Sequence, residues 1–182
     1  MTIKQGKLIA LEGLDDRELL REGKLLLRTR SADRAGGVSQ WGASGLFFQL
    51  DHSPCPEIPS PKTLLMLYAA DLEFRLRWEI LPLLEEGLDV VAAPYVETAA
   101  AFGAAAGIEP EWIERLFSFA PKPGAAFRLR KPAAESKGMP AHCFQILAGA
   151  SGHWKKRSGR KPLNERLARL EALPAAPRKK SR

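Results

Sequence analysis

Residues 7–30 most constrain how this chain can fold, because a buried strand there runs directly into a glycine. The apolar run at residues 8–11 predicts the strand, and Glu12-Gly13-Leu14-Asp15 follows where a phosphate-binding loop would begin. Such a loop has the form G-x-x-x-x-G-K-[ST], in which glycines let backbone N–H groups approach phosphate, and the lysine and hydroxyl contact phosphate and Mg²⁺. Five residues after Gly13 the chain has Glu18 and then two leucines, so the loop begins without being completed.

The formal net charge of +7 is unevenly distributed. Residues 151–182 contain eleven Lys/Arg and two Glu, a net of +9, so residues 1–150 sum to −2. This division attributes any nonspecific attraction to polyanions to the C-terminal tail. We expect an α/β domain over residues 1–150, followed over residues 151–182 by a short basic helix at residues 164–173 and a disordered Pro/Lys/Arg-rich end.

The composition is that of an ordinary globular domain. A chain of 182 residues, 45% hydrophobic and 27% charged, is long enough to bury a core. It has no run near the roughly 18 apolar residues of a membrane span, and its first residues lack the apolar core of a signal peptide. Cys55, Cys143 and three scattered histidines form no metal-ligand pattern. We expect a cytoplasmic protein without metal, cofactor or membrane contact.

Strands and helices are expected to alternate. The strongest helical pattern covers residues 63–86, with Ser60 as N-cap and a kink or a restart at Pro82. Other helices are expected at residues 16–22, ended by Gly23, and at 96–106 and 111–119. Strands are expected at residues 8–11, 25–27, 89–93, 125–129 and 144–147, with a Ser/Gly/Pro-rich loop over 31–61. The alternation predicts an α/β fold of three layers, α/β/α, with a mostly parallel five-stranded sheet.

The order of these segments resembles bacterial thymidylate kinases, which have a P-loop NTPase fold. Residues 8–15 resemble the family's first strand and loop, and residues 64–86, with Tyr68-Ala69-Ala70-Asp71, resemble its F-A-A-D-R helix. Four further segments follow in the family's order. Residues 19–30 resemble the end of its first helix and its second strand, and Arg34-Ala35-Gly36-Gly37 lies where the family has E-P-G-G. Residues 90–95 resemble its D-R-Y strand, and residues 100–112 its A-Y-Q-G…P-E-W segment. The resemblance is continuous to about residue 119.

The departures from the family concern phosphate chemistry. The loop lysine is absent, D-R-Y becomes Ala93-Pro94-Tyr95, the arginine after F-A-A-D becomes Leu72, and the lid segment is short. We interpret the short spacing between Gly13 and Gly36 as a deletion of the loop and part of the first helix. Losing one electrostatic donor typically costs on the order of 100–1000-fold in rate. We therefore expect no meaningful kinase activity and a non-catalytic interaction module. The alternatives are a residual nucleotide or nucleoside binder, or a weak kinase.

The resemblance also implies a nucleoside site. Asp15 matches a residue near the acceptor sugar, Tyr68 matches the aromatic that stacks on thymine, Phe102 matches an aromatic beside the same nucleotide, and Tyr95 is kept from D-R-Y. Core packing of the aromatics, and capping of the first helix by Asp15, are alternative interpretations.

Two basic regions remain. A dense run after Trp154 predicts contact with a polyanion such as nucleic acid, the alternative being a solubilising tail; it consists of Lys155, Lys156, Arg157, Arg160 and Lys161. Arg75 and Arg77 are interpreted as part of a solvated helix face. The resemblance to a dimeric family also predicts a homodimer or a related heterodimer through the helix at residues 63–86, and the protein partner is unknown.

Overall fold

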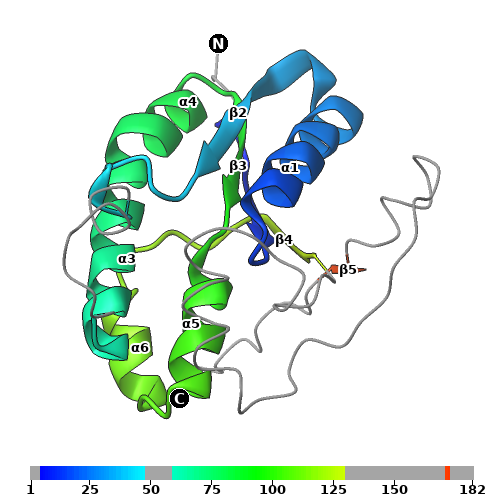
Figure 1. Ribbon diagram of the computed structural model, residues 1–182. Coiled ribbons are helices and arrows are strands. Elements are labelled where there is room, and N and C mark those ends of the chain that lie inside the picture. The colour runs from blue at the N-terminus through cyan, green and yellow to red at the C-terminus, as the bar shows by residue number, and fades with distance from the viewer. Residues whose placement is uncertain (1–4, 48–58, 130–170, 173–182) are drawn as a thin grey trace, which may run out of the picture.

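The computed structural model describes residues 5–47, 59–129 and 171–172 of the chain. Its first half contains β1 (Leu8–Glu12), α1 (Asp16–Arg30), η1 (Ala32–Arg34), β2 (Ala35–Gln40), α3 (Pro61–Arg75), η2 (Leu76–Ile80) and α4 (Leu81–Glu85). These are followed by β3 (Asp89–Ala93), α5 (Val96–Ala105), α6 (Pro110–Leu116), β4 (Ala125–Arg128) and β5 (Glu171–Ala172). Figure 1 shows the sheet between α1 on one side and α3, α4, α5 and α6 on the other.

The sheet has the strand order β2-β3-β1-β4-β5. The first four strands are parallel, and the two-residue β5 pairs antiparallel with β4. The predicted α/β class and parallel sheet are therefore confirmed, with four parallel strands rather than five. The strand expected at residues 144–147 lies outside the described residues, as does the proposed domain boundary at residue 150.

Alternating side chains of the two central strands divide the core into two clusters. Leu8 and Ala10 of β1 face a cluster with residues of α3, α5 and α6, whereas Ile9 and Leu11 face a cluster with residues of α1. All five residues of β1 are buried, as expected for a parallel strand covered on both faces. The three-layer arrangement follows from this period-two alternation.

The helix α1 corrects two predictions. It runs for 15 residues through Gly23, so the expected end at Gly23 and the expected strand at residues 25–27 are both wrong. Leu19, Leu26 and Leu27 all belong to the α1-side cluster, at the spacing of one helical face. A run of three leucines suits either a strand or a helix, and packing on the sheet decides between them. The first helix is thus 15 residues long, and residues 13–15 alone separate it from β1.

The second strand, β2, lies inside the stretch predicted to be loop. The polypeptide approaches β3 closely here: a Cβ at Gly36 would stand 3.0 Å from Leu88 Cβ and 3.1 Å from the Asp89 carbonyl oxygen. The register to β3 shifts between Ala35 and Gly37, which marks a bulge. Ala35-Gly36-Gly37 is therefore the start of an edge strand, and close contact with Leu88 and Asp89 explains the glycine at position 36.

The long predicted helix is confirmed as three continuous pieces. Ser60 caps α3 by accepting a hydrogen bond from the Thr63 N–H at 3.2 Å, as predicted. The π-helical turn η2 separates α3 from α4, and Pro82 lies in the first turn of α4, where a proline needs no N–H partner. Gly87, at φ +83°, follows α4. The α-helical pattern is thus interrupted at η2 and restarts with Pro82 in the first turn of α4.

The remaining predictions are partly confirmed. The helices expected at residues 96–106 and 111–119 correspond to α5 and α6, and the strands at 89–93 and 125–129 to β3 and β4. Of the helix expected at residues 164–173, the two described residues form β5 instead; the rest lies outside the described ranges. Within those ranges, none of the helices combines the length and apolar character that a bilayer crossing needs.

Candidate functional site

The candidate site lies where β1, β2 and β3 end, at one edge of the sheet. The connection from β1 leads through α1 to β2, whereas the connection from β3 leads through α5 and α6 to β4, on the opposite side of β1. The chain therefore leaves β1 and β3 in opposite directions. Open α/β sheets bind ligands in the crevice that such a divergence creates at the carboxyl ends of the strands.

Only three residues connect β1 to α1. Asp15 is the N-cap of α1, and its Oδ1 accepts a hydrogen bond from the Glu18 N–H at 2.8 Å. Gly13 donates its N–H to Thr98 Oγ1 at 3.1 Å, and a Cβ at this glycine would stand 3.1 Å from Leu129 Cβ. The turn is therefore closely packed. The helix terminus that receives a phosphate in a phosphate-binding loop is here capped by a carboxylate of the chain itself.

Glu12, the last residue of β1, connects that strand to the start of α5. It is 1% exposed, and its Oε2 accepts hydrogen bonds from the Tyr95 N–H (3.1 Å), the Thr98 N–H (3.0 Å) and Thr98 Oγ1 (2.6 Å). Its Oε1 accepts a fourth from the Glu97 N–H at 3.1 Å. Burial raises the pKa of Glu12, and these hydrogen bonds oppose the rise. The carboxylate satisfies N–H groups at the start of α5 that lack helical partners.

Arg75 connects the ends of β2 and β3 from the last turn of α3. The residue is 0% exposed, and its guanidinium donates to Ser39 Oγ (2.9 Å), the Ser39 carbonyl (2.7 Å) and the Pro94 carbonyl (3.0 Å). Ser39 in turn donates to Glu79 Oε2 at 2.6 Å. Within the described ranges no carboxylate lies within 4.0 Å of this cation. The interpretation of Arg75 as a solvated residue is therefore wrong, whereas Arg77 is exposed.

The turn that follows β2 is held to the helices on both sides of the sheet. Asp71 of α3 accepts hydrogen bonds from the Gly42 N–H (2.9 Å), the Ser44 N–H (3.0 Å) and Ser44 Oγ (2.6 Å). On the other side, the Trp41 indole donates to Asp16 Oδ1 at 2.7 Å. Burial raises the pKa of Asp16 to about 6; the hydrogen bond from Trp41 lowers it and the neighbouring Asp15 carboxylate raises it. These contacts fix where the indole of Trp41 lies.

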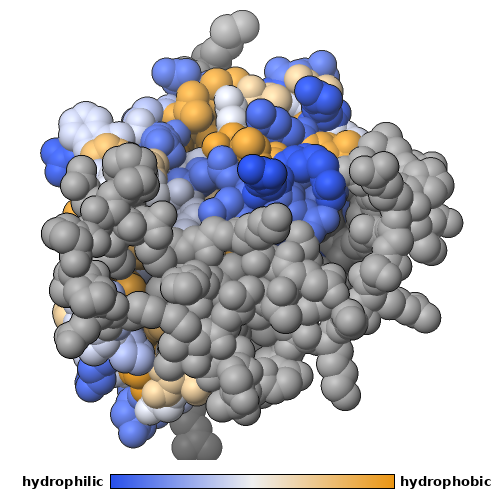
Figure 2. All heavy atoms as spheres, viewed as in Figure 1, coloured by the Kyte–Doolittle hydropathy of each residue, from blue (hydrophilic) through white to orange (hydrophobic). Residues whose placement is uncertain are grey.

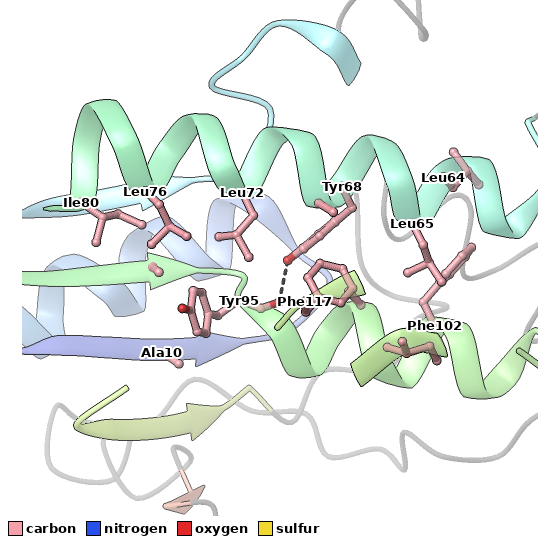
Figure 3. Close-up of a cluster of buried hydrophobic side chains, with 14 of the residues drawn as sticks. Ala10, Leu64, Leu65, Tyr68, Leu72, Leu76, Ile80, Tyr95, Phe102 and Phe117 are labelled. Carbon is pink, nitrogen blue, oxygen red and sulfur yellow. Dashed lines mark hydrogen bonds between the residues drawn. The ribbon is translucent and has the colours of Figure 1, made fainter. Parts of the chain in front are cut away.

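The predicted nucleoside-contacting aromatics lie in the core on the α3 side of the sheet. Tyr68 donates its hydroxyl to the Tyr95 carbonyl at 2.7 Å, the bond drawn in Figure 3. Tyr95 donates its own hydroxyl to the Pro121 carbonyl at 2.7 Å, and Phe102 is buried in the same cluster. Burial raises the pKa of both tyrosines. The structure thus brings Tyr68, Tyr95 and Phe102 together, while Asp15 caps α1.

Trp41 lies beside Tyr68 on the side of the turn. Their ring centroids are 6.2 Å apart, and the ring of Phe47 is 4.4 Å from that of Trp41. Next to this indole, an open groove of about 580 Å³ runs between β2 and the η2–α4 helices, with Ser39, Trp78 and Glu79 in its lining. A groove of this volume is large enough for a nucleotide-sized molecule.

Sequence reasoning did not identify Glu12, Asp16, Ser39, Trp41 and Arg75 as members of this arrangement. A signal existed for Arg75: it follows Tyr68 by seven residues and Leu72 by three, on the buried face of the helix. The basic residues predicted to bind polyanions, Lys155, Lys156, Arg157, Arg160 and Lys161, lie outside the described residues. In the part of the chain that the structure describes, no three His, Cys, Asp or Glu side chains gather as metal ligands would.

Comparison with known proteins fits this architecture. No protein-family profile matches the chain. The chain is 29% identical over 127 residues to "Probable thymidylate kinase 2" of Saccharolobus solfataricus, covering 69% of this chain and 60% of that relative. It is 38% identical over 71 residues to "Probable thymidylate kinase" of Pyrococcus abyssi, covering 39% of this chain and 35% of the relative. The chain therefore spans less than two thirds of these relatives.

Solved structures give the same fold. The thymidylate kinase of Ehrlichia chaffeensis aligns with a TM-score of 0.57 at 15% identity, over 80% of this chain and 87% of that one. The thymidylate kinase of Candida albicans aligns with a TM-score of 0.55 at 18% identity, over 81% and 78%. The fold is that of the P-loop NTPase-like α/β proteins. The chain is similar to thymidylate kinases in sequence and in fold, as its sequence resemblance predicted.

These comparisons correct one expectation. The missing loop lysine, the altered D-R-Y, Leu72 in place of an arginine and the short lid together led to the prediction of no meaningful kinase activity. The relatives found by sequence are named thymidylate kinases, which points to a nucleotide-kinase type of protein, and nothing in the comparisons indicates loss of catalysis. The prediction of a non-enzyme was therefore wrong, because it weighed the changed phosphate-contacting residues above the similarity of the rest of the chain.

Proposed function

We propose that this chain is a thymidylate kinase-type nucleotide kinase of low turnover. The observation that carries the proposal is the similarity over 127 residues to "Probable thymidylate kinase 2", of which the chain spans 60%. The proposed acceptor is a nucleoside monophosphate bound at the carboxyl ends of β1, β2 and β3. Phosphoryl transfer depends mostly on positioning and electrostatic stabilisation. Low turnover is proposed because the chain lacks the loop lysine and the arginine after F-A-A-D that would supply them.

The acceptor base is proposed to stack on Tyr68. The ring of Trp41, which belongs to the turn held by Asp71, now lies beside this ring, and Phe47 packs against Trp41. Binding therefore requires this turn to move aside, and the emission of Trp41 should report that movement. The acceptor phosphate would approach Ser39, behind which lies the Arg75 guanidinium. A buried guanidinium is the strongest nearby source of positive potential for a phosphate.

The donor side is less complete. Between Glu12 and Arg17 the chain offers no lysine or hydroxyl to a magnesium-bound triphosphate, and Asp15 and Asp16 place two carboxylates there. The residues present do not fit that group, so we assign no step to it. Cations for donor phosphates could come from Arg128 at the end of β4, or from Arg130, Lys131 and Lys137, which follow in the sequence outside the described residues.

Two measurements on the full chain test this proposal. Thermal-shift titration with dTMP, thymidine and ATP measures binding, since a ligand at about 100 times its Kd stabilises the folded state by about 2.7 kcal/mol. ADP release with dTMP and ATP measures transfer, and we expect turnover well below one per second. Tyr68→Phe keeps the ring and removes only the hydroxyl, so it should retain binding, whereas Tyr68→Leu should lose it. Absence of both a thermal shift and transfer would overturn the proposal.

We also propose that the protein associates with a second copy, or with a related chain, through the outer face of α3, η2 and α4. Four large apolar side chains are exposed there: Met66 (49%), Phe74 (39%), Trp78 (63%) and Leu81 (38%). Such a row of exposed apolar residues is typical of an interaction surface. Sedimentation velocity should detect a dimer that Phe74→Glu with Leu81→Glu dissociates. Arg115→Glu on α6 changes net charge by the same amount and should not. The proposal would be contradicted if the protein sedimented as a monomer at all concentrations, both alone and in extracts of its host.

A further inference from the structure

The outer face of α1 carries a row of positive side chains. Arg17, Arg21, Lys24 and Arg28 follow one another at intervals of four, three and four residues, and all four are exposed. At 100° per residue they lie within about 60° of one another around the helix axis, with rises of about 6, 4.5 and 6 Å between neighbours. We call these four residues the α1 basic ridge. Figure 2 shows hydrophilic side chains gathered over α1.

Most of this positive charge has no partner in the described part of the protein. Arg21 forms ion pairs with Glu18 at 2.5 Å and with Glu22 at 3.0 Å. Arg17, Lys24 and Arg28 make no ion pair with any residue inside the described ranges. Long cationic side chains arranged in this way can neutralise an external anion without first breaking an internal salt bridge.

The ridge is carried on a rigid support. The opposite face of α1 is buried on the sheet through Leu19, Leu26 and Leu27, and Gly23 lies directly against β2. The axial spacing of the four cations is therefore fixed by a complete helix, and not by a loop. Because the apolar face of α1 is already used in the core, the helix has no apolar surface left to insert into a bilayer, as an interfacial membrane helix requires.

The two sides of the sheet differ in charge. Residues 16–30, which form α1, carry five Lys/Arg and three Asp/Glu, a net of +2. Residues 61–116, which include all helices of the other face, carry four Lys/Arg and ten Asp/Glu, a net of −6. The small net charge of residues 1–150 thus results from a positive helix on one side of the sheet and negative helices on the other. Besides the basic tail, α1 therefore presents a second positive side that can attract a polyanion.

We propose that the α1 basic ridge binds the phosphate backbone of a nucleic acid, with the acidic helical face turned away from it. The ridge contains no aromatic side chain, so it contacts phosphates and reads no bases. Binding is sequence-independent and, with three to four phosphate contacts, falls in the range of nonspecific affinities, with Kd on the order of 10⁻⁴ to 10⁻⁶ M at physiological salt. This proposal does not depend on nucleotide-kinase activity.

The test uses the full chain with the tail cations removed, so that the ridge is measured alone. In this background Lys155, Lys156, Arg157, Arg160 and Lys161 are all replaced by Gln. Binding to a fluorescein-labelled 20-base-pair duplex of mixed sequence is followed by anisotropy between 50 and 200 mM salt. Replacing three ridge cations, as Arg17→Gln, Lys24→Gln and Arg28→Gln, should make the slope of log K against log salt shallower by about 2.7, at roughly 0.9 per contact.

The matched control removes three exposed cations from the other face, as Lys62→Gln, Arg77→Gln and Arg115→Gln. It changes the net charge equally and should leave the slope unchanged. Equal effects of both triple variants would show that only net charge matters and would overturn the proposal, as would absence of binding in the tail-neutral background. Equal binding to phosphatidylserine vesicles would overturn the nucleic-acid assignment. Circular dichroism checks folding, and the single variant Lys24→Glu gives an independent measure if the triple variant unfolds.

Discussion

Gly23 of α1 and Val38 of β2 are in contact so close that a Cβ at position 23 would stand 3.0 Å from Val38 Cγ1 and 3.1 Å from Cγ2. A glycine in the middle of a helix costs about 0.5–1 kcal/mol relative to alanine. Here it lets the helix lie directly on the edge strand, and α1 continues for a further seven residues to Arg30. This one contact explains why the glycine does not end the helix.

Gly23→Ala should therefore destabilise the protein, although alanine is the better helix former. The added methyl must displace the Val38 side chain, and overpacking of this kind typically costs about 1–3 kcal/mol. The better helix propensity of alanine offsets part of this cost. We therefore expect the free energy of unfolding, measured by urea denaturation, to fall by about 1 kcal/mol. In the double variant with Val38→Ala, the added methyl has room, so Gly23→Ala should no longer carry the overpacking cost. An increase in stability for Gly23→Ala alone would show that α1 can move away from β2.

Arg75 should contribute strongly to stability, because its loss leaves the Ser39 and Pro94 carbonyl groups buried without their donor. Each unsatisfied buried polar group costs about 1–3 kcal/mol. We expect Arg75→Met to lower the free energy of unfolding by about 3 kcal/mol. The neighbouring Arg77→Met, at an exposed position, should change it by less than about 0.5 kcal/mol. Similar effects of the two substitutions in denaturant titrations would contradict the assignment of Arg75 to the core.

Asp16 should make stability depend on pH. Its pKa in the folded protein is about 6 against an ordinary value of 3.8, so the folded state binds the proton more tightly than the unfolded chain does. The resulting stabilisation is fully present below pH 3.8 and is lost as the pH rises through about 6. The shift corresponds to about 3 kcal/mol, which solvent exposure of the side chain reduces to about 1–2 kcal/mol.

The measurement compares the native chain with Asp16→Asn, which cannot titrate, in urea denaturation at pH 4, 5, 6 and 7.5. The stability of the variant relative to the native protein should increase by about 1–2 kcal/mol across this range. Asp33→Asn, at an exposed position of η1, controls for the general loss of a negative charge. A difference that is constant with pH would show that the Asp16 carboxyl titrates alike in the folded and unfolded states.

Asp71 should hold the turn at residues 41–45 in place. Asp71→Ala removes the acceptor of three hydrogen bonds from Gly42 and Ser44. We expect the amide protons of these two residues to exchange at least tenfold faster, and the Trp41 emission to shift to longer wavelength as the indole gains solvent. Ser44→Ala removes only the hydroxyl donor and should give a smaller effect. Unchanged exchange at Gly42 would mean that Trp41 alone holds the turn.

Much of the fold could be predicted because most hydrophobic patterns in the sequence fit only one type of secondary structure. The buried strand at residues 89–93, the partly buried strand expected at 125–129 and the long helix capped by Ser60 have the lengths of their types. Residues 25–27 and 31–61 were ambiguous. Three consecutive leucines fit a strand or a helix, and the glycines of β2 look like loop residues until the proximity of Leu88 and Asp89 is known.

The candidate site was less predictable than the fold. Family resemblance named Tyr68, Tyr95 and Phe102, and the structure brings these three together in one cluster. Glu12 and Arg75 were missed because their importance lies in partners far away in sequence: Glu12 bonds to residues 83–86 positions later, and Arg75 to a serine 36 positions earlier. Pairing of this kind depends on the sheet order, and no local pattern records it.

The bulge in β2 has a consequence for solubility. Among the described residues, β2 is the terminal strand of the sheet, with a neighbouring strand on one side only. Exposed edge strands of this kind tend to recruit strands from other molecules and so start aggregation. The register shift between Ala35 and Gly37 interrupts the regular spacing that an incoming strand would need. The irregular segment around Gly36, which allows β2 to approach β3, thus helps to keep concentrated protein from assembling edge to edge.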